Sequence, residues 1–146
     1  MEIKLGGEFV VNKKQDDVYS FLVDPKCFCP LLPDYESLAV QDDNSFLVKL
    51  RVGISHIRGT AAVKLALAES EKPKHAVYKG QGEVPGGNAT LRAAFDLEPV
   101  SGGTKVLWTG DAHVFGRIAS LAGGLLEPLA KKNLQKLIDA LQAALQ

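Results

Sequence analysis

The last thirty or so residues, from 116 to 146, constrain the fold of this chain more than any other segment. Their apolar residues recur at steps of three and four, which is the pattern of an amphipathic helix. A helix of about 30 residues is roughly 45 Å long, enough to cover one face of a sheet. Gly123, Gly124 and Pro128 interrupt its first half, so we expect the helix to bend there. The apolar positions are Ile118, Leu121, Ala122, Leu125, Leu129, Leu134, Leu137, Ile138, Leu141 and Leu145.

Most of the preceding chain alternates between apolar and polar residues, which predicts β-strands. The first strand is followed by a predicted helix at 13–23 and a proline-rich segment at 25–35 with room for a short helical turn. Short turns between consecutive strands, such as the polar turn at 42–44, favour antiparallel pairing. We therefore predict an α+β fold in one domain, 1–146, with a curved seven-stranded antiparallel sheet wrapped around the terminal helix. The strands are expected at 2–11, 36–40, 45–52, 54–68, 75–82, 88–98 and 104–115.

Charge and hydropathy exclude several classes of protein. Lys and Arg together number 17, as do Asp and Glu, and the net charge of zero argues against a nucleic-acid-binding surface. No apolar stretch reaches the length of a membrane-spanning helix, and the charged residues near the N-terminus exclude a signal peptide, so we predict a cytoplasmic protein. Cys27 and Cys29 stand too close for an unstrained disulfide and show no metal-ligand spacing with the histidines, so we predict no metal site.

Small residues are frequent at the strand positions that should face the helix. A tightly filled core would carry larger side chains there. Two interpretations follow: the helix approaches the sheet closely through Gly123 and Gly124, or the small residues leave an apolar cavity. The small positions are Ala61, Ala76, Gly80, Ala89, Ala93, Gly110 and Ala112.

The same alternation places no Asp, Glu or His on the predicted inner face. Asp111 and His113 share a face of their strand, but that face points outward. Acid-base and nucleophilic catalysis need titratable groups within reach of a substrate, and the sequence shows no phosphate-binding loop or nucleophile elbow. We therefore predict no catalytic residues and a binding protein in place of an enzyme.

Short motifs spread over the whole chain point to a known family. They are Gly7-Glu8-Phe9, Leu32-Pro33, Val52-Gly53, Gly80-Gln81-Gly82, Thr104-Lys105-Val106-Leu107-Trp108 and Gly116-Arg117-Ile118-Ala119-Ser120-Leu121. In this order the chain resembles the CoxG family, named for the CoxG subunit of carbon monoxide dehydrogenase, within the START-like (SRPBCC) superfamily of polyketide cyclases and pollen allergens. The chain departs from that family at Pro33-Asp34, where members often have Pro-Gly.

The resemblance implies a helix-grip fold with a hydrophobic cavity and a non-catalytic accessory role. It implies binding of a quinone or other lipid, with no further cofactor, and recruitment of, or electron transfer from, a carbon monoxide dehydrogenase-like molybdenum hydroxylase. It also implies peripheral contact with the inner face of the cell membrane. Two alternatives stay open: a cyclase or hydrolase acting on an apolar substrate, and a pure assembly or tethering factor.

Alternation and resemblance together predict the residues of the ligand site. A lid or rim is expected from the proline-rich segment, at Phe28, Leu32, Pro33 and Tyr35. The predicted ligand-binding residues are Phe9, Leu50, Val63, Leu65, Tyr78, Leu91, Ala93, Phe95, Trp108, Ala112, Leu121, Gly124, Leu125 and Pro128.

Overall fold

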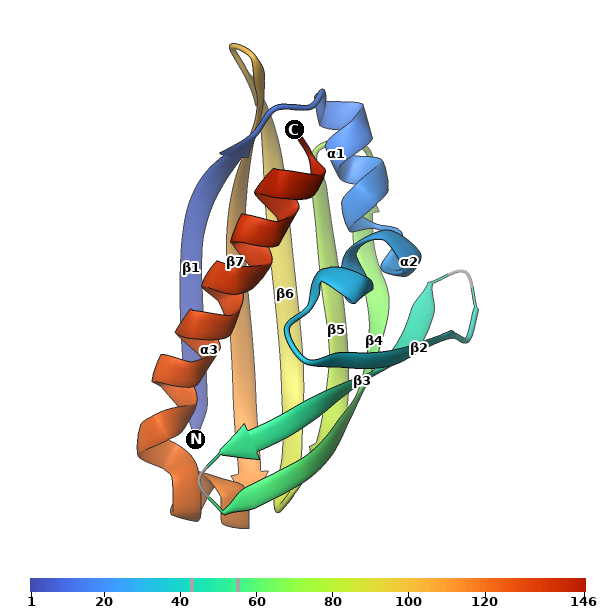
Figure 1. Cartoon of the computed structure of the whole chain (residues 1–146). Coiled ribbons are helices and arrows are strands. Elements are labelled where there is room, and N and C mark those ends of the chain that lie inside the picture. The colour runs from blue at the N-terminus through green and yellow to red at the C-terminus, as the bar shows by residue number, and fades with distance from the viewer. Residues whose placement is uncertain (43, 55) are drawn as a thin grey trace.

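A computed structural model of the chain describes residues 1–42, 44–54 and 56–146. One sheet and one long helix dominate it (Figure 1). The strands are β1 (Glu2–Val11), β2 (Tyr35–Val40), β3 (Ser45–Ile54), β4 (Ile57–Glu71), β5 (His75–Val84), β6 (Gly87–Val100) and β7 (Gly103–Gly116). The helices are α1 (Gln15–Leu22), α2 (Pro25–Phe28), the 3₁₀ turn η1 (Cys29–Leu31) and α3 (Arg117–Ala144).

All seven strands form one antiparallel sheet in the order β1-β7-β6-β5-β4-β3-β2. Each strand from β2 to β7 pairs with its neighbour in the sequence, as short turns require, and β1 joins the sheet beside β7. The register places Gly7 opposite Trp108 and Ala93 opposite Gly110. The predicted curved antiparallel sheet with a long terminal helix is confirmed.

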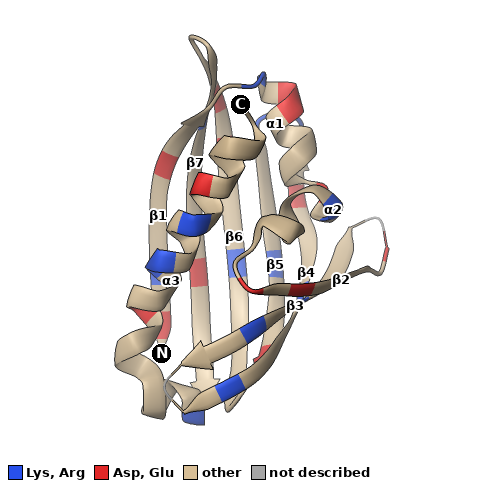
Figure 2. Ribbon diagram, viewed as in Figure 1, with Lys and Arg blue, Asp and Glu red and all other residues tan. Residues whose placement is uncertain are grey.

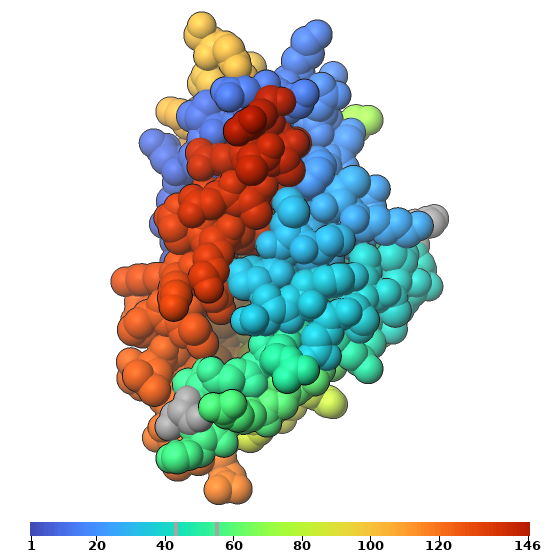
Figure 3. Space-filling model, viewed as in Figure 1, coloured from blue at the N-terminus to red at the C-terminus, as the bar shows by residue number. Residues whose placement is uncertain are grey.

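Helix α3 lies diagonally across the concave face of the sheet, and hydrogen bonds fix both of its ends (Figure 1). The Ile118 amide donates to the Gly86 carbonyl at 3.0 Å, and the Asn12 amide donates to the Leu145 carbonyl at 2.9 Å. The segment from α1 to η1 covers the neighbouring part of the same face, and in the space-filling view it lies beside α3 (Figure 3).

The hydrophobic core consists of two separate clusters of buried residues. One cluster packs α1 and the C-terminal end of α3 against the sheet and includes Val18, Phe46 and Val106. The second cluster lies at the opposite end of α3 and includes Ile118, Ala122 and Leu126. The helix therefore packs on the sheet at both ends.

Some predicted boundaries shift. The predicted strand 54–68 begins at Ile57 and runs to Glu71, because β3 continues to Ile54. That predicted strand and the predicted turn 42–44 each contain one residue, 55 and 43 respectively, outside the described residues. Within those residues, none of the helices combines the length and apolar character needed to cross a membrane.

The terminal helix is bent in its first half, as predicted, since its first turns run in a different direction from the rest (Figure 1). Pro128 lies inside α3, which continues through it as one assigned helix. Gly124 is exposed and a Cβ there would meet no atom within 4 Å, while a Cβ at half-buried Gly123 would meet the Met1 sulfur at 3.5 Å and no strand residue. The close approach of the helix through these glycines is therefore wrong, and the small residues of the sheet need another explanation.

Candidate functional site

An apolar cavity of about 180 Å³ lies between the sheet and the C-terminal half of α3. Its walls come from β1, α1, α2, β5, β6, β7 and α3, and none of its fifteen described residues is Asp, Glu, His, Lys or Arg. They are Phe9, Leu22, Phe28, Tyr78, Ala93, Ala94, Phe95, Val106, Trp108, Thr109, Gly110, Leu134, Leu137, Ile138 and Leu141.

Two small residues on neighbouring strands make room for this cavity. Ala93 and Gly110 are paired across β6 and β7, and both face the helix. A Cβ at Gly110 would meet no other atom within 4 Å, so the missing side chain leaves open space. Of the two explanations for the small residues, the cavity therefore applies at this pair.

The cavity is open to solvent on one side. Ala93 is exposed although it faces the interior of the fold. A molecule can therefore reach the apolar walls without unfolding of the sheet.

Other small residues serve a different purpose. A Cβ at Gly80 would stand 1.9 Å from the Lys64 carbonyl oxygen and 2.9 Å from Leu65 Cα. Glycine at this position lets β4 and β5 approach closely. The alternation that singled out Gly80 and Gly110 as small inward positions could not separate close approach from empty space.

A cluster of three aromatic rings closes one end of the cavity. Phe28 lies 5.7 Å from Tyr78 and 5.8 Å from Phe46, measured between ring centroids, in tilted or edge-to-face contact. The Tyr78 hydroxyl donates to the Leu22 carbonyl at 2.9 Å, which ties β5 to α1. Burial raises the pKa of Tyr78, so its hydroxyl stays neutral.

Trp108 forms another part of the wall, and its indole nitrogen is unsatisfied. Among the described residues, Trp108 Nε1 is the one buried side-chain nitrogen or oxygen without a hydrogen-bond partner. Gly7 lies opposite Trp108, and a Cβ at Gly7 would stand 3.4 Å from Nε1. The indole therefore occupies the space that a side chain at position 7 would otherwise need.

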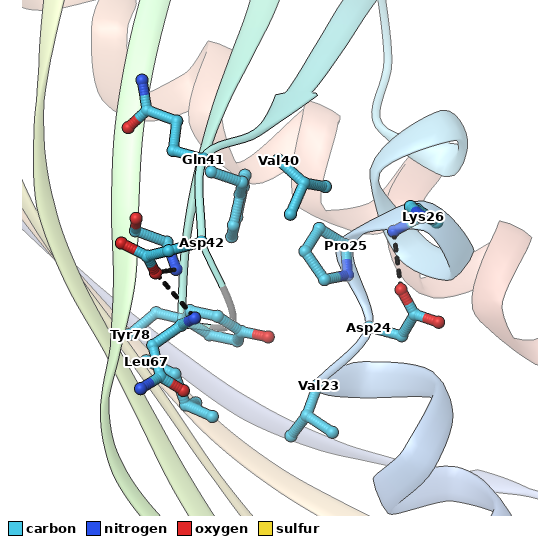
Figure 4. Close-up of a pocket in the computed structure, with 12 residues that line it drawn as sticks. Val23, Asp24, Pro25, Lys26, Val40, Gln41, Asp42, Leu67 and Tyr78 are labelled. Carbon is cyan, nitrogen blue, oxygen red and sulfur yellow. Dashed lines mark hydrogen bonds between the residues drawn. The ribbon is translucent and has the colours of Figure 1, made fainter.

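A second, outer hollow of about 450 Å³ lies between the α1–α2 connection and the β2–β3 hairpin (Figure 4). Val23 and Pro25 lie on one side, Val40 and Gln41 on the other, and Tyr78 is shared with the apolar cavity. Its polar groups are held by local contacts. The Asp24 carboxylate accepts from the Lys26 amide at 3.0 Å, and the Asp42 carboxylate accepts from two amides of the hairpin.

A third hollow of about 220 Å³ lies at the other end of α3. Leu126 and Leu129 cover it, and Ile118 and Leu50 contribute to its walls. Asp34 and Asn133 give it polar edges. The first cavity has a mainly apolar lining with no charged residue, which makes it the better candidate for an apolar ligand.

The structure brings only part of the predicted site together. Phe9, Tyr78, Ala93, Phe95 and Trp108 line the apolar cavity, and so does Phe28, which was expected in the lid. Other predicted residues pack elsewhere on the same face: Val63, Leu65, Leu32 and Tyr35 against the first core cluster, Leu91 and Ala112 against the second, and Leu50 and Pro33 beside the third hollow.

The predicted contribution of the first half of α3 is wrong. Leu121 and Leu125 are 63% and 52% exposed, and Gly124 and Pro128 are exposed as well, so none of them faces the sheet. The buried stripe runs through Ala122 and Leu126 because the helix is held at Ile118. The cavity is instead covered by the second half of α3, through Leu134, Leu137, Ile138 and Leu141, which were not among the predicted ligand-binding residues.

At Pro33-Asp34, where the sequences this chain resembles often have Pro-Gly, the backbone takes a conformation that glycine favours. Asp34 has a φ of 60°, the left-handed conformation that glycine adopts without strain and that Asp tolerates better than most residues. Its carbonyl accepts from the Arg51 amide at 2.8 Å. Asp34 thus fits a position where Pro-Gly is common.

The Asp, Glu, His, Lys and Arg side chains of the described residues lie outside the apolar cavity. His56 and His113 are exposed, and the His113 ring stacks on Phe115 at 4.4 Å on the outer side of the sheet. Charged residues of both signs are interspersed over the strands and along α3 (Figure 2). Burial raises the pKa of Cys29 to about 12, so this thiol is unreactive. No cluster of three metal-ligating side chains occurs in the part of the chain described.

Comparison with known proteins identifies the family. The sequence pattern of the CoxG subunit of carbon monoxide dehydrogenase matches residues 7–146. The chain belongs to the CoxG family. Among curated proteins, none matches the sequence significantly.

Solved structures agree with the START-like helix-grip fold of this CoxG-family protein. A conserved protein from Geobacillus kaustophilus superposes with a TM-score of 0.86 at 20% identity, over 98% of this chain and 95% of the other. The ZhuI aromatase/cyclase from Streptomyces sp. R1128 superposes with a TM-score of 0.73 at 15% identity, over 99% of this chain and 93% of the other. A START superfamily protein from Mycobacterium smegmatis superposes with a TM-score of 0.70 at 15% identity, over 97% of this chain and 96% of the other. Family and fold together indicate a hydrophobic-ligand-binding domain.

Proposed function

We propose that this CoxG-family protein binds an apolar molecule, a quinone or other lipid, in the cavity between the sheet and α3. The observation that carries the proposal is an opening to solvent, at Ala93, into a space whose described lining is apolar. Transfer of apolar surface from water into such a site is favourable, at roughly 25 cal/mol per Å².

The volume of the cavity limits what can be enclosed. A space of about 180 Å³ is near the size of cavities that hold a single aromatic ring, and smaller than the 300–1,000 Å³ typical of sites for larger ligands. A quinone or lipid would place its ring or one end of its chain inside. Its remaining chain would leave through the opening beside Ala93.

A binding role is better supported than catalysis. General acid-base chemistry needs titratable groups at the substrate, and the fifteen lining residues supply no carboxylate, imidazole or amine. A cyclase or hydrolase, as suggested by the fold of the aromatase/cyclase, would need such a group to enter the cavity. The histidines and Asp111 of the outer face do not fit that requirement.

The direct test is to identify what the purified protein carries. Organic extraction followed by mass spectrometry should yield an isoprenoid quinone or another lipid in amounts approaching one molecule per protein. Titration of the protein with 2-methyl-1,4-naphthoquinone should give saturable binding. Absence of extractable apolar molecules together with absence of saturable binding would refute the proposal.

The accessory role is proposed from the family. As a CoxG-family protein, the chain would serve a carbon monoxide dehydrogenase-like molybdenum hydroxylase, by recruiting it or by accepting its electrons on a bound quinone. Immobilised carbon monoxide dehydrogenase should retain the wild-type protein. Retention of an Ala93→Phe variant that no longer binds quinone would instead favour a pure tethering factor. Overpacking by phenylalanine costs roughly 1–3 kcal/mol, so the fold of the variant must be checked by circular dichroism.

Peripheral membrane contact is proposed for the first turns of α3. Leu121 and Leu125 are exposed there, and Arg117 is the only charged residue in 117–126. Apolar side chains beside a cation suit an anionic lipid surface. Replacing both leucines by asparagine should abolish sedimentation with anionic vesicles, whereas Val10→Asn, at an exposed position on β1, should not. Equal sedimentation of the wild type and the double variant would refute this contact.

A further inference from the structure

Trp108 carries a hydrogen-bond donor that the protein itself does not use. Buried polar groups in folded proteins almost always have a partner, and each exception calls for an explanation. The Trp108 Nε1 atom is such an exception among the described residues. An indole nitrogen can only donate, so its missing partner must be an acceptor.

The indole lies at the border of two spaces. One is the apolar cavity, and the other is a hollow of about 250 Å³ at the seam between β1 and α3. Leu134 and Ile138 line both spaces together with Trp108. Gly7 places no side chain over the nitrogen, since even a Cβ there would stand 3.4 Å from it. The donor is thus positioned between the apolar cavity and the hollow at this seam, next to the Leu134 and Ile138 side chains that line both spaces.

The other polar groups of the cavity are committed elsewhere. The Tyr78 hydroxyl already donates to the Leu22 carbonyl. Thr109 is exposed, and the alternation of β7 turns its side chain to the face opposite Trp108. Trp108 therefore offers the free donor among the residues that line the cavity.

We infer that Trp108 Nε1 donates a hydrogen bond to an oxygen of the bound molecule, so that the ligand is an apolar molecule carrying a carbonyl or similar accepting oxygen. This inference rests on the proposed binding function and specifies the ligand class. A pure hydrocarbon leaves the donor unpaired, and a charged group inside the apolar cavity meets no opposite charge among its lining residues, since Lys131 lines the hollow of about 250 Å³. Because solvent does not reach Nε1 in the empty cavity, binding includes a shift of the indole or of the covering Leu134 and Ile138 side chains.

Two matched probes test the inference. The first is 2-methyl-1,4-naphthoquinone, and the second is 2-methylnaphthalene, which has the same ring skeleton without carbonyls. Their affinities are measured for the wild type, for Trp108→Phe, and for a protein with 3-benzothienylalanine at position 108, which keeps the indole shape without the N–H. The ratio of the two affinities isolates the carbonyl contribution from changes in packing.

Removing the N–H should lower the quinone-to-hydrocarbon affinity ratio about tenfold, the value of one buried neutral hydrogen bond. The infrared carbonyl band of the bound quinone should lie at lower wavenumber in the wild type than in both variants. Val10→Ala, at an exposed position on β1 outside the cavity lining, should leave the ratio unchanged.

An unchanged ratio and an unshifted carbonyl band in the position-108 variants would overturn the role of Trp108 while the binding function stands. Failure of the wild type to bind either probe would overturn both. The benzothienyl protein keeps the test decisive if Trp108→Phe folds poorly.

Discussion

Filling the apolar cavity at Gly110 should stabilise the protein and weaken ligand binding at the same time. A Cβ at Gly110 would meet nothing within 4 Å, and the position faces a cavity of about 180 Å³. One buried methyl contributes about 0.8 kcal/mol, and loss of glycine's freedom in the unfolded chain adds roughly 0.4–1 kcal/mol. We therefore expect Gly110→Ala to raise the free energy of unfolding by about 1–2 kcal/mol.

The valine variant extends the same calculation. Two further carbons add up to about 1.6 kcal/mol, reduced in part because the cavity is open to solvent. For a chain of 146 residues, roughly 2–4 °C per kcal/mol makes these gains visible as a higher Tm in thermal unfolding followed by circular dichroism. Gly110→Val should also weaken binding of 2-methyl-1,4-naphthoquinone by at least about tenfold, since its side chain occupies the same space.

Gly53 provides the matched control. It lies in strand β3, is exposed, and would also accept a Cβ with no atom within 4 Å. Gly53→Ala and Gly53→Val change the freedom of the unfolded backbone and the strand propensity in the same way as the Gly110 variants, but they bury no added side chain. If the Gly110 variants are no more stable than the Gly53 variants, or if they bind quinone as the wild type does, the cavity is not the ligand site.

Three further changes test other parts of the structure. Gly80→Ala should lower the free energy of unfolding by about 3 kcal/mol or more, because the new Cβ would stand 1.9 Å from the Lys64 carbonyl oxygen. A variant as stable as the wild type in urea unfolding would contradict the close approach of β4 and β5. Tyr78→Phe should cost about 1 kcal/mol through loss of the hydroxyl bond to Leu22, and an unchanged urea midpoint would argue against that bond. The hydrogen bond with Asp96 at 2.8 Å, assisted by Glu69, raises the pKa of His75 above 6.5. The stabilisation that protonated His75 gives is therefore full below pH 6.5 and is lost as the pH rises through the raised pKa. In urea titrations, the difference in free energy of unfolding between wild type and His75→Gln should shrink from pH 5.5 to 8.5. A difference that grows with pH would contradict the raised pKa of His75.

The sheet could be predicted from sequence because alternation acts residue by residue. Phe95, Leu97 and Val106 face inward as their positions require, and the short turns leave few topologies other than an antiparallel meander. The register between β1 and β7 follows once both strands are placed in one sheet with a buried face.

The helix face was harder to predict because its first half is apolar on more than one side. Leu121 and Leu125 fit a helical stripe about as well as Ala122 and Leu126 do. What decides between the stripes is the contact of the Ile118 amide with the Gly86 carbonyl, a link between the helix start and a distant turn. No periodicity within residues 116–146 contains that information.

Predicting which inward residues line the cavity also requires knowing contacts between distant parts of the chain. Alternation identifies Leu91 and Ala93 as inward alike, yet Leu91 packs in the second core cluster and Ala93 opens into the cavity. The difference is set by where the diagonal helix passes over β6. Trp108 was recognised as inward, but the unpaired state of its nitrogen becomes visible only when every neighbour is placed.

The pairing of β1 with β7 sets an order of events for folding. Residues 2–11 are synthesised long before their partners at 104–113, so this contact joins segments that are far apart in the sequence. Hairpins from β2 to β6 can form during synthesis, while β1 has no partner strand and its Ile3 and Val11 side chains, buried in the folded protein, are still exposed to solvent. Long-range closure of this kind slows folding and prolongs the exposure of apolar strand edges. A chain interrupted before residue 103 would therefore be expected to aggregate in place of folding into a smaller domain.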